Sequence, residues 1–162
     1  MRIKNNMKIE VEQLSEIYEK DYFLWLEQTI KLLKNRHLNQ IDYDHLIEEL
    51  EELGNEQKRK VESLLEQIIR HLLLYQYWET EFQYNSHHWH AEIIGFRTQI
   101  KRRLTTNLKQ YLSQELLSIY ADALKFVKAK TQLDNFPQQC PYTFEQILDE
   151  DWLPTLTHSK KS

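Results

Sequence analysis

The stretch that decides the fold is residues 42–78, which read DYDHLIEELEELGNEQKRKVESLLEQIIRHLLLYQYW. Apolar side chains recur in it every three or four positions, which is the period of one face of an α-helix. The period continues in phase on both sides of Gly54, and no proline follows that glycine. The pattern predicts one long helix over about residues 43–78, kinked or straight at Gly54, and a helix–turn–helix break there is the alternative. The apolar positions are Leu46, Ile47, Leu50 and Leu53, then Val61, Leu64, Leu65, Ile68 and Leu72.

Composition favours helices for the rest of the chain as well. The 162 residues suit one domain with one core. Only two glycines and three prolines are present, and these are the residues that turns between short elements use most. We therefore expect an all-α fold, a single-domain bundle of about five helices. One helix is long, at about 43–78, and a proline-containing segment near the C-terminus leads into a short one.

Three further helices are predicted from the same period. They cover about residues 14–34 or 18–34, residues 86–106, and residues 108–131 or 113–131, with a break at Thr106 and Asn107. Ser86 is expected to cap the second of these, as Asp42 caps the long helix. The apolar face of the first is expected to consist of Phe23, Leu26, Ile30 and Leu33.

The C-terminal part begins with two prolines that interrupt any helix between Phe136 and Pro141. Thr143 then starts a short helix, and Gln146 three residues later completes a capping box. We expect residues 1–13 to form a flexible N-terminus, residues 14–154 a single helical domain, and residues 155–162 a flexible tail.

Charge and cysteine content exclude several classes of protein. The net charge is −4 and Cys140 is the single cysteine, so no disulfide framework and no bulk attraction to nucleic acid is expected. Cys140 is interpreted as a small buried apolar residue. The first residues lack the apolar core of a signal peptide, and no run is long enough to span a membrane. We expect a cytoplasmic protein.

An acidic run in the long helix is the first candidate site. It comprises Glu48, Glu49, Glu51 and Glu52, and His45 stands four residues before Glu49, a spacing that suits a shared metal ion. Helical di-iron sites, however, use Glu-x-x-His pairs, and none occurs in the chain. The favoured interpretation is a solvated face on which Glu49 accepts hydrogen bonds from a neighbouring helix.

Two further residues lie beside predicted apolar faces. His71 has the position of a general base whose pKa is moved by burial, although a hydrogen-bonded core histidine is favoured. Arg97 follows Phe96 near the core side of its helix and is expected to pair with a buried carboxylate, for which Glu49 is a candidate. His45, Glu49 and His71 are accordingly the weak candidates for metal ligands.

Two clusters complete the candidates. His87, His88 and His90 are dense, but their spacing and an expected place at a helix N-terminus disfavour a metal site. A basic group around the end of the same helix is interpreted as a solvated face rather than a phosphate-binding stripe. Its members are Arg97, Lys101, Arg102, Arg103 and Lys109.

Several segments together resemble the bacterial family called domain of unknown function 29. The matching segments are Tyr18–Trp25, Asp42–Gly54, His71–Tyr75, Trp89–Arg97 and Phe136–Pro154, which lie in family order over about residues 18–154. The resemblance implies an all-helical, intracellular prokaryotic protein and no assigned activity. It singles out Glu48, Glu49, Glu51, His71, Trp89 and Arg97. This chain departs from the family where Tyr75 replaces Trp and Leu74 replaces Lys.

The function favoured by these observations is a protein-interaction or regulatory module, because no residues have catalytic spacing. One version is the regulatory half of a two-protein, toxin–antitoxin-like system. The alternative is a metal-assisted hydrolase or nuclease that uses Glu48, Glu49 and His71 with a divalent metal ion, so enzyme activity stays open. We expect no other cofactor, a protein partner or a homo-oligomer, and no membrane contact. Nucleic-acid binding is not favoured.

Overall fold

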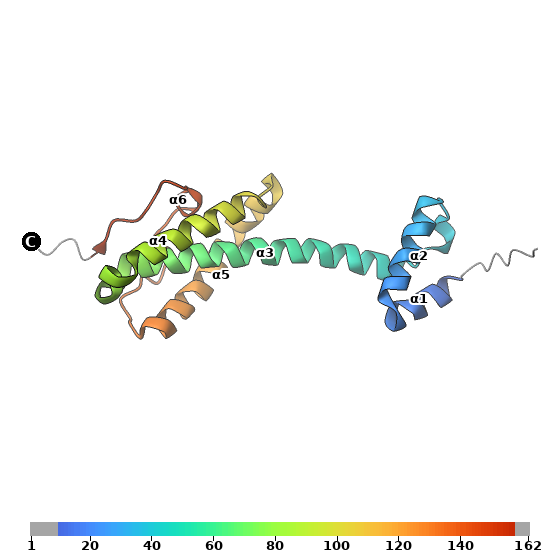
Figure 1. Ribbon diagram of the computed structural model, residues 1–162, viewed down its shortest axis with the longest axis horizontal. Helices are drawn as coiled ribbons and strands as arrows, with labels where there is room; N and C mark the ends of the chain where they lie inside the picture. The colour runs from blue at the N-terminus through green and yellow to red at the C-terminus, as the bar shows by residue number, and fades with distance from the viewer. Residues whose placement is uncertain (1–9, 158–162) are drawn as a thin grey trace, which may run out of the picture. The chain divides into compact units, whose positions relative to one another are not determined.

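The computed structural model describes residues 10–157, and these residues form helices joined by loops, of which the one between Thr131 and Phe144 is long (Figure 1). The α-helices are α1 Val11–Lys20, α2 Tyr22–Lys34, α3 Tyr43–Tyr77, α4 Glu79–Lys101, α5 Thr106–Thr131 and α6 Phe144–Leu148, with a 3₁₀ turn η1 at Leu38–Gln40. No strand occurs within residues 10–157. The predicted all-α fold is confirmed.

Helix α3 matches the predicted long helix to within one residue at its end. It runs through Gly54 without interruption, so the helix–turn–helix alternative is wrong. A Cβ added at Gly54 meets nothing within 4 Å, so close packing does not require a glycine there. The uninterrupted apolar period, rather than the single glycine, decides the outcome.

Contacts divide the chain into two compact units, one ending at Glu56 and the other beginning at Gln57. We call them unit 1 and unit 2 and describe each by itself. The predicted limits of the helical domain, 14–154, stay a prediction, and residues 1–9 and 158–162 lie outside the described part. Residues 11–13 were expected to be loose, but they form the first turn of α1.

Unit 1 contains α1, α2, η1 and the start of α3. Where one helix was predicted there are two, because Asp21 ends α1 and caps α2. Its side chain accepts a hydrogen bond from the Leu24 N–H at 3.0 Å, which satisfies a donor that the first turn leaves open. Leu14 and Trp25 are fully buried and form the small core, together with Ile41.

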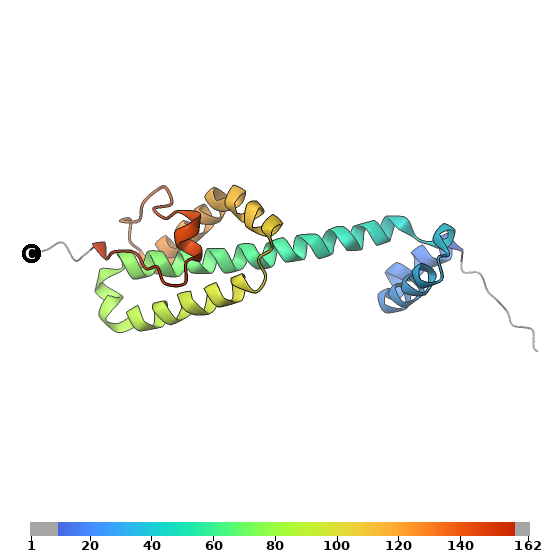
Figure 2. The same cartoon turned by 90° about the horizontal axis from the view of Figure 1, so that it is seen from above.

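Unit 2 contains the rest of α3 with α4, α5 and α6. Helix α4 returns along the C-terminal half of α3, and α5 lies along the same half (Figures 1 and 2). The apolar faces predicted here are buried in one cluster. Its members from α3 are Val61, Leu65, Ile68, Ile69, Leu72, Leu73 and Leu74, joined by Trp89, Ile93 and Ile100 from α4 and Leu112, Ile119, Ala123 and Val127 from α5.

Helix boundaries in unit 2 differ from the prediction at both ends of α4 and at the start of α5. Helix α4 starts at Glu79, directly after Trp78, and Ser86 lies inside it. Helix α5 starts at Thr106, because the Thr105 side chain accepts from the Leu108 N–H, so the expected break at Thr106 lies a few residues too late. The predicted end at Thr131 and the capping box of Thr143 are confirmed.

None of the helices within residues 10–157 has the length and apolar character needed to cross a bilayer.

Candidate functional site

Unit 1 holds a cluster of aromatic and ionisable side chains around Glu49. The Tyr18 hydroxyl on α1 donates to Glu49 Oε1 at 2.7 Å, and the Tyr22 hydroxyl on α2 donates to Glu49 Oε2 at 2.7 Å. These bonds tie three helices together at one carboxylate. They lower the pKa of Glu49 and raise the pKa of Tyr18 to about 12, because they favour the ionised acid and the protonated phenol. The expected bond from a neighbouring helix to Glu49 is thus present.

A second acid lies deeper in the same cluster. Asp42 Oδ2 accepts from the Trp25 indole N–H at 3.2 Å and lies 2.6 Å from His45 Nδ1. The His45 ring stacks on Tyr18, with 3.9 Å between ring centres. The hydrogen bond to Asp42 raises the pKa of His45, although burial acts in the opposite direction. Trp25 and Asp42 are buried, so this pair fixes the start of α3 against α2.

The geometry around His45 differs from a hydrolase relay. Ser15 Oγ lies 3.4 Å from His45 Nδ1, the same nitrogen that contacts Asp42. A Ser–His–Asp relay needs the hydroxyl and the carboxylate on opposite ring nitrogens. The set Ser15, His45 and Asp42 therefore does not form a nucleophilic triad.

The outer acids and the apolar faces of unit 1 are exposed. Glu48, Glu51 and Glu52 are exposed on α3. The faces predicted to be core also reach the surface, which corrects that prediction. Phe23, Ile30 and Leu33 on α2, and Ile47, Leu50 and Leu53 on α3, are between 36% and 67% exposed. Within residues 57–157, the large apolar side chains exposed in this way are Tyr84, Ile94, Leu117 and Phe126.

Arg97 in unit 2 is buried, with 1% of its surface exposed. Its guanidinium donates to three backbone carbonyls of the C-terminal segment. The acceptors are Ile147 O at 2.8 Å, Trp152 O at 2.8 Å and Gln146 O at 3.0 Å. Burial lowers the pKa of Arg97. The arginine was expected to pair with Glu49, but both groups have other partners, each within its own unit.

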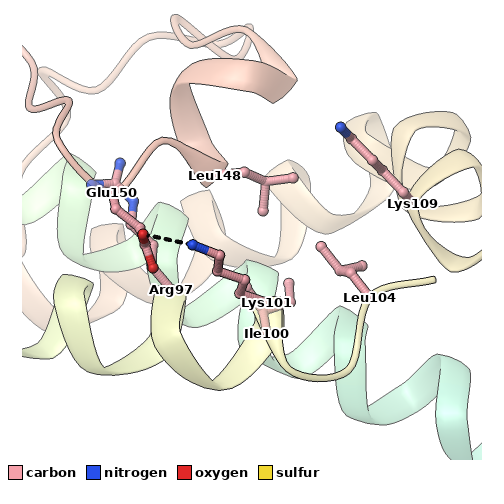
Figure 3. Close-up of a pocket in the computed structure, with 7 residues that line it drawn as sticks. All are labelled: Arg97, Ile100, Lys101, Leu104, Lys109, Leu148 and Glu150. Carbon is pink, nitrogen blue, oxygen red and sulfur yellow. Dashed lines mark hydrogen bonds and ion pairs between the residues drawn. The ribbon is translucent and has the colours of Figure 1, made fainter. Parts of the chain in front are cut away.

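A pocket of about 390 Å³ lies beside Arg97 (Figure 3). The Lys101 ammonium pairs with Glu150 at 2.9 Å within its lining. Lys109, from α5, also lines the pocket, so three members of the predicted basic group lie here, whereas Arg102 and Arg103 are exposed and do not line it. The remaining lining residues are Ile100, Leu104 and Leu148.

His71 is half-buried in unit 2. Its Nδ1 lies 2.7 Å from the Gln67 carbonyl, to which it donates, and its ring contacts Phe96. Burial lowers the pKa of His71, so the neutral form is favoured. This is the geometry of the favoured, hydrogen-bonded core histidine. His71 belongs to a different unit from His45 and Glu49.

The histidine cluster lies in the interior of α4, and not at a helix N-terminus as expected. His87, His88 and His90 are exposed, whereas Trp89 is buried and stacks on Trp78. No three His, Cys, Asp or Glu side chains within residues 10–157 are grouped so as to hold a metal ion. The Cys140 thiol is half-buried, and burial raises its pKa.

The sequence singled out Glu49 but missed its donors, Tyr18 and Tyr22, and the pair of Asp42 and His45. The available signal was the dense aromatic segment from Tyr18 to Trp25, just ahead of the acidic run. Its two tyrosines are separated by the break at Asp21.

Comparison with known proteins identifies the family. No curated protein and no solved structure matches this chain. A model of the family described as Domain of unknown function DUF29 matches residues 17–153, which span the larger part of each unit. The match contains the cluster around Glu49, His71 and the Arg97 contacts. The chain therefore belongs to the family Domain of unknown function DUF29.

Proposed function

We propose that this chain is a protein-interaction module with a regulatory role, and that it binds its partner through the exposed apolar faces of unit 1. The observation that carries this function is the combination of helical apolar spacing with exposure. Phe23, Ile30 and Leu33, like Ile47, Leu50 and Leu53, recur as buried faces do, yet all six are exposed.

The exposed side chains are grouped by the helices that carry them. Successive residues of an α-helix are about 100° apart, so Phe23, Ile30 and Leu33 fall within one arc of about 80° on α2. Ile47, Leu50 and Leu53 fall within an arc of about 120° on α3. Single exposed leucines are ordinary, but two such stripes in one small unit are typical of an interaction surface.

The energetics also support binding. Complete burial of one Leu, Ile or Phe side chain stabilises a protein or complex by about 1.5–3 kcal/mol. Side chains that are about half exposed have about half of that still to gain on association. The cluster around Glu49 supports these helices with hydrogen bonds, so the stripes sit on a pre-ordered scaffold.

Replacement of Leu50 and Leu53 by Gln tests this function. Cross-linking in a lysate, followed by quantitative mass spectrometry, is expected to recover a partner with the unchanged chain and to lose it with L50Q/L53Q. The control L117Q removes a leucine that is 77% exposed in unit 2 and should retain the partner. Recovery of the same proteins by all three chains contradicts the proposed function.

The metal-assisted hydrolase that uses Glu48, Glu49 and His71 remains a proposal, as does the toxin–antitoxin-like version of the interaction module. Metal analysis of the purified chain tests the first, since a hydrolase of this type needs a bound divalent ion. Gene neighbourhood tests the second, because the two proteins of such a system are encoded together.

A further inference from the structure

We infer that the partner which binds the apolar stripe of α3 in unit 1 is a basic amphipathic helix, an inference that rests on the proposed function. Two features carry it: the acidic residues of unit 1 that lie beside this stripe, and the length of the stripe.

Unit 1 is strongly acidic, and unit 2 is not. Residues 1–56 contain thirteen Asp or Glu and seven Lys or Arg, a formal charge of −6. Residues 57–162 contain twelve Asp or Glu and fourteen Lys or Arg, a formal charge of +2. The net charge of the chain is therefore concentrated in the unit that exposes the apolar stripes. A partner with Lys or Arg beside its own apolar face is attracted to this unit, and an acidic one is repelled.

The acids also lie beside the α3 stripe. Glu51 follows Ile47 by four residues and is therefore its neighbour on the helix surface. Asp44 and Glu48 continue the same acidic side, and all three carboxylates are exposed. An apolar strip with a carboxylate edge is complementary to a helix that places Leu or Ile between Lys or Arg residues.

The α3 stripe has the length of a short helix. Tyr43 is 49% exposed and lies in the same arc as Ile47, Leu50 and Leu53, so it extends the stripe by one turn. At about 1.5 Å per residue, the span from Tyr43 to Leu53 is about 15 Å. Three turns of a partner helix, with apolar residues at spacings of three and four, cover that distance.

The same charge disfavours the other occupants. A second copy would bring together two units that each carry a formal charge of −6. Nucleic acid and membranes of anionic lipid are also negative and are repelled from these carboxylates. Each of these remains as an outcome of the experiment.

The test measures fluorescence anisotropy of labelled peptides with the purified full-length chain. Three peptides of 18 residues are compared: an amphipathic helix with Leu on one face and Lys or Arg elsewhere, the same helix with Glu elsewhere, and a scrambled form of the basic peptide without an apolar face. The basic amphipathic peptide should bind at least about tenfold more tightly than either of the others.

Variants of the chain separate the contribution of the apolar side chains to binding from that of the carboxylates beside them. L50Q/L53Q should weaken binding of the basic peptide by about tenfold or more, and the control L117Q should not change it. E48Q/E51Q should weaken it by about threefold and reduce its dependence on salt. Circular dichroism of each variant checks that the helices are retained, which we expect because all the changed side chains are exposed.

Each other result overturns the inference in a recognisable way. Equal binding of the acidic and basic amphipathic peptides contradicts the inference that the partner helix is basic, and it leaves the proposed interaction function unaffected. Loss of a dimer in L50Q/L53Q by sedimentation equilibrium identifies a second copy as the occupant. Binding to vesicles of phosphatidylglycerol identifies a membrane surface. Binding of no peptide, with no lost partner in the cross-linking experiment, overturns both this inference and the proposed function.

Discussion

Units 1 and 2 use the same apolar period for different purposes. On α3, Leu65 is fully buried in unit 2, whereas Leu50 is 59% exposed in unit 1, although both belong to one uninterrupted pattern on one helix. In unit 2, α4 and α5 pack against α3 and bury its apolar face, whereas in unit 1 the hydroxyls of Tyr18 and Tyr22 hold α3 through hydrogen bonds to Glu49. A helical period of apolar residues therefore identifies the face of a helix that is suited to burial. It does not show whether another helix of the same chain or a separate partner buries that face.

The largest expected effect is on the stability of unit 2, in which Arg97 binds the C-terminal segment through three hydrogen bonds. Arg97→Met removes three hydrogen bonds from a charged donor and leaves buried carbonyls without a partner, so we expect a loss of about 3–5 kcal/mol in the free energy of unfolding. Urea titration followed by circular dichroism measures it. Arg97→Lys retains one donor group and should be less destabilising. A loss below about 1 kcal/mol for Met would show that the C-terminal segment does not depend on this contact.

A paired substitution on α3 tests the difference between the units directly. Leu65→Ala should lower the free energy of unfolding by about 2–5 kcal/mol, because it leaves a cavity in the core. Leu50→Ala should change it by less than about 0.5 kcal/mol, because the side chain is exposed. Both are measured in the same urea titration. Equal losses would mean that Leu50 is buried in solution.

The polar support of unit 1 should show an intermediate effect. Tyr18→Phe removes the hydrogen bond to Glu49 Oε1 and should destabilise unit 1 by about 1 kcal/mol. It should also raise the pKa of Glu49 toward its ordinary value, because that hydrogen bond is the main cause of the lowering. Carboxyl NMR titration reports this pKa. Tyr84→Phe is the control, since Tyr84 is an exposed tyrosine of unit 2. An unchanged Glu49 titration would contradict the bond.

The smallest effect is a difference in pH dependence between the units. The raised pKa of His45 means that the folded state takes up a proton first, so unit 1 gains stability as pH falls through the folded pKa and loses it as pH rises. The lowered pKa of His71 has the opposite sign. Unit 2 loses stability as pH falls below the ordinary histidine value of about 6.5, because the unfolded state is protonated first.

Amide hydrogen exchange, resolved by helix and corrected for the intrinsic pH dependence, measures this difference. Protection of α1 and α2 should rise between pH 8 and 6.5, and protection of α4 should fall between pH 6.5 and 5. Asp42→Asn should remove the first change, since it removes the group that raises the His45 pKa. If the protection of both units changed in the same direction with pH, that result would contradict the opposite pKa shifts of His45 and His71.

Much of the fold was predictable because it depends on local pattern. The length of α3 follows from its period, and the start of α6 follows from the Thr143 capping box. The turn between α3 and α4 was not predictable in this way. It needs only one non-helical residue, Trp78, and contains neither glycine nor proline, so the sequence pattern favours Ser86 as the capping residue instead.

The candidate site was only partly predictable. Glu49 lies at the edge of an apolar face, and that edge could be located from helical geometry. The partners of Arg97 are backbone carbonyls about 50 residues along the chain. Every residue has a backbone carbonyl, so the amino-acid sequence does not indicate which carbonyls accept from the arginine. Asp21 both ends α1 and caps α2 while the apolar residues continue around it, which concealed the break.

The most direct test of the central difference is the chemical accessibility of α3 in the free chain. Leu50→Cys and Leu65→Cys, each in a Cys140→Ser background, are alkylated with iodoacetamide. Leu50→Cys should react within about threefold of its rate in urea, and Leu65→Cys at least about a hundredfold more slowly than in urea. Equal protection of the two thiols would show that the unit 1 stripe is already covered, and would contradict an open docking surface.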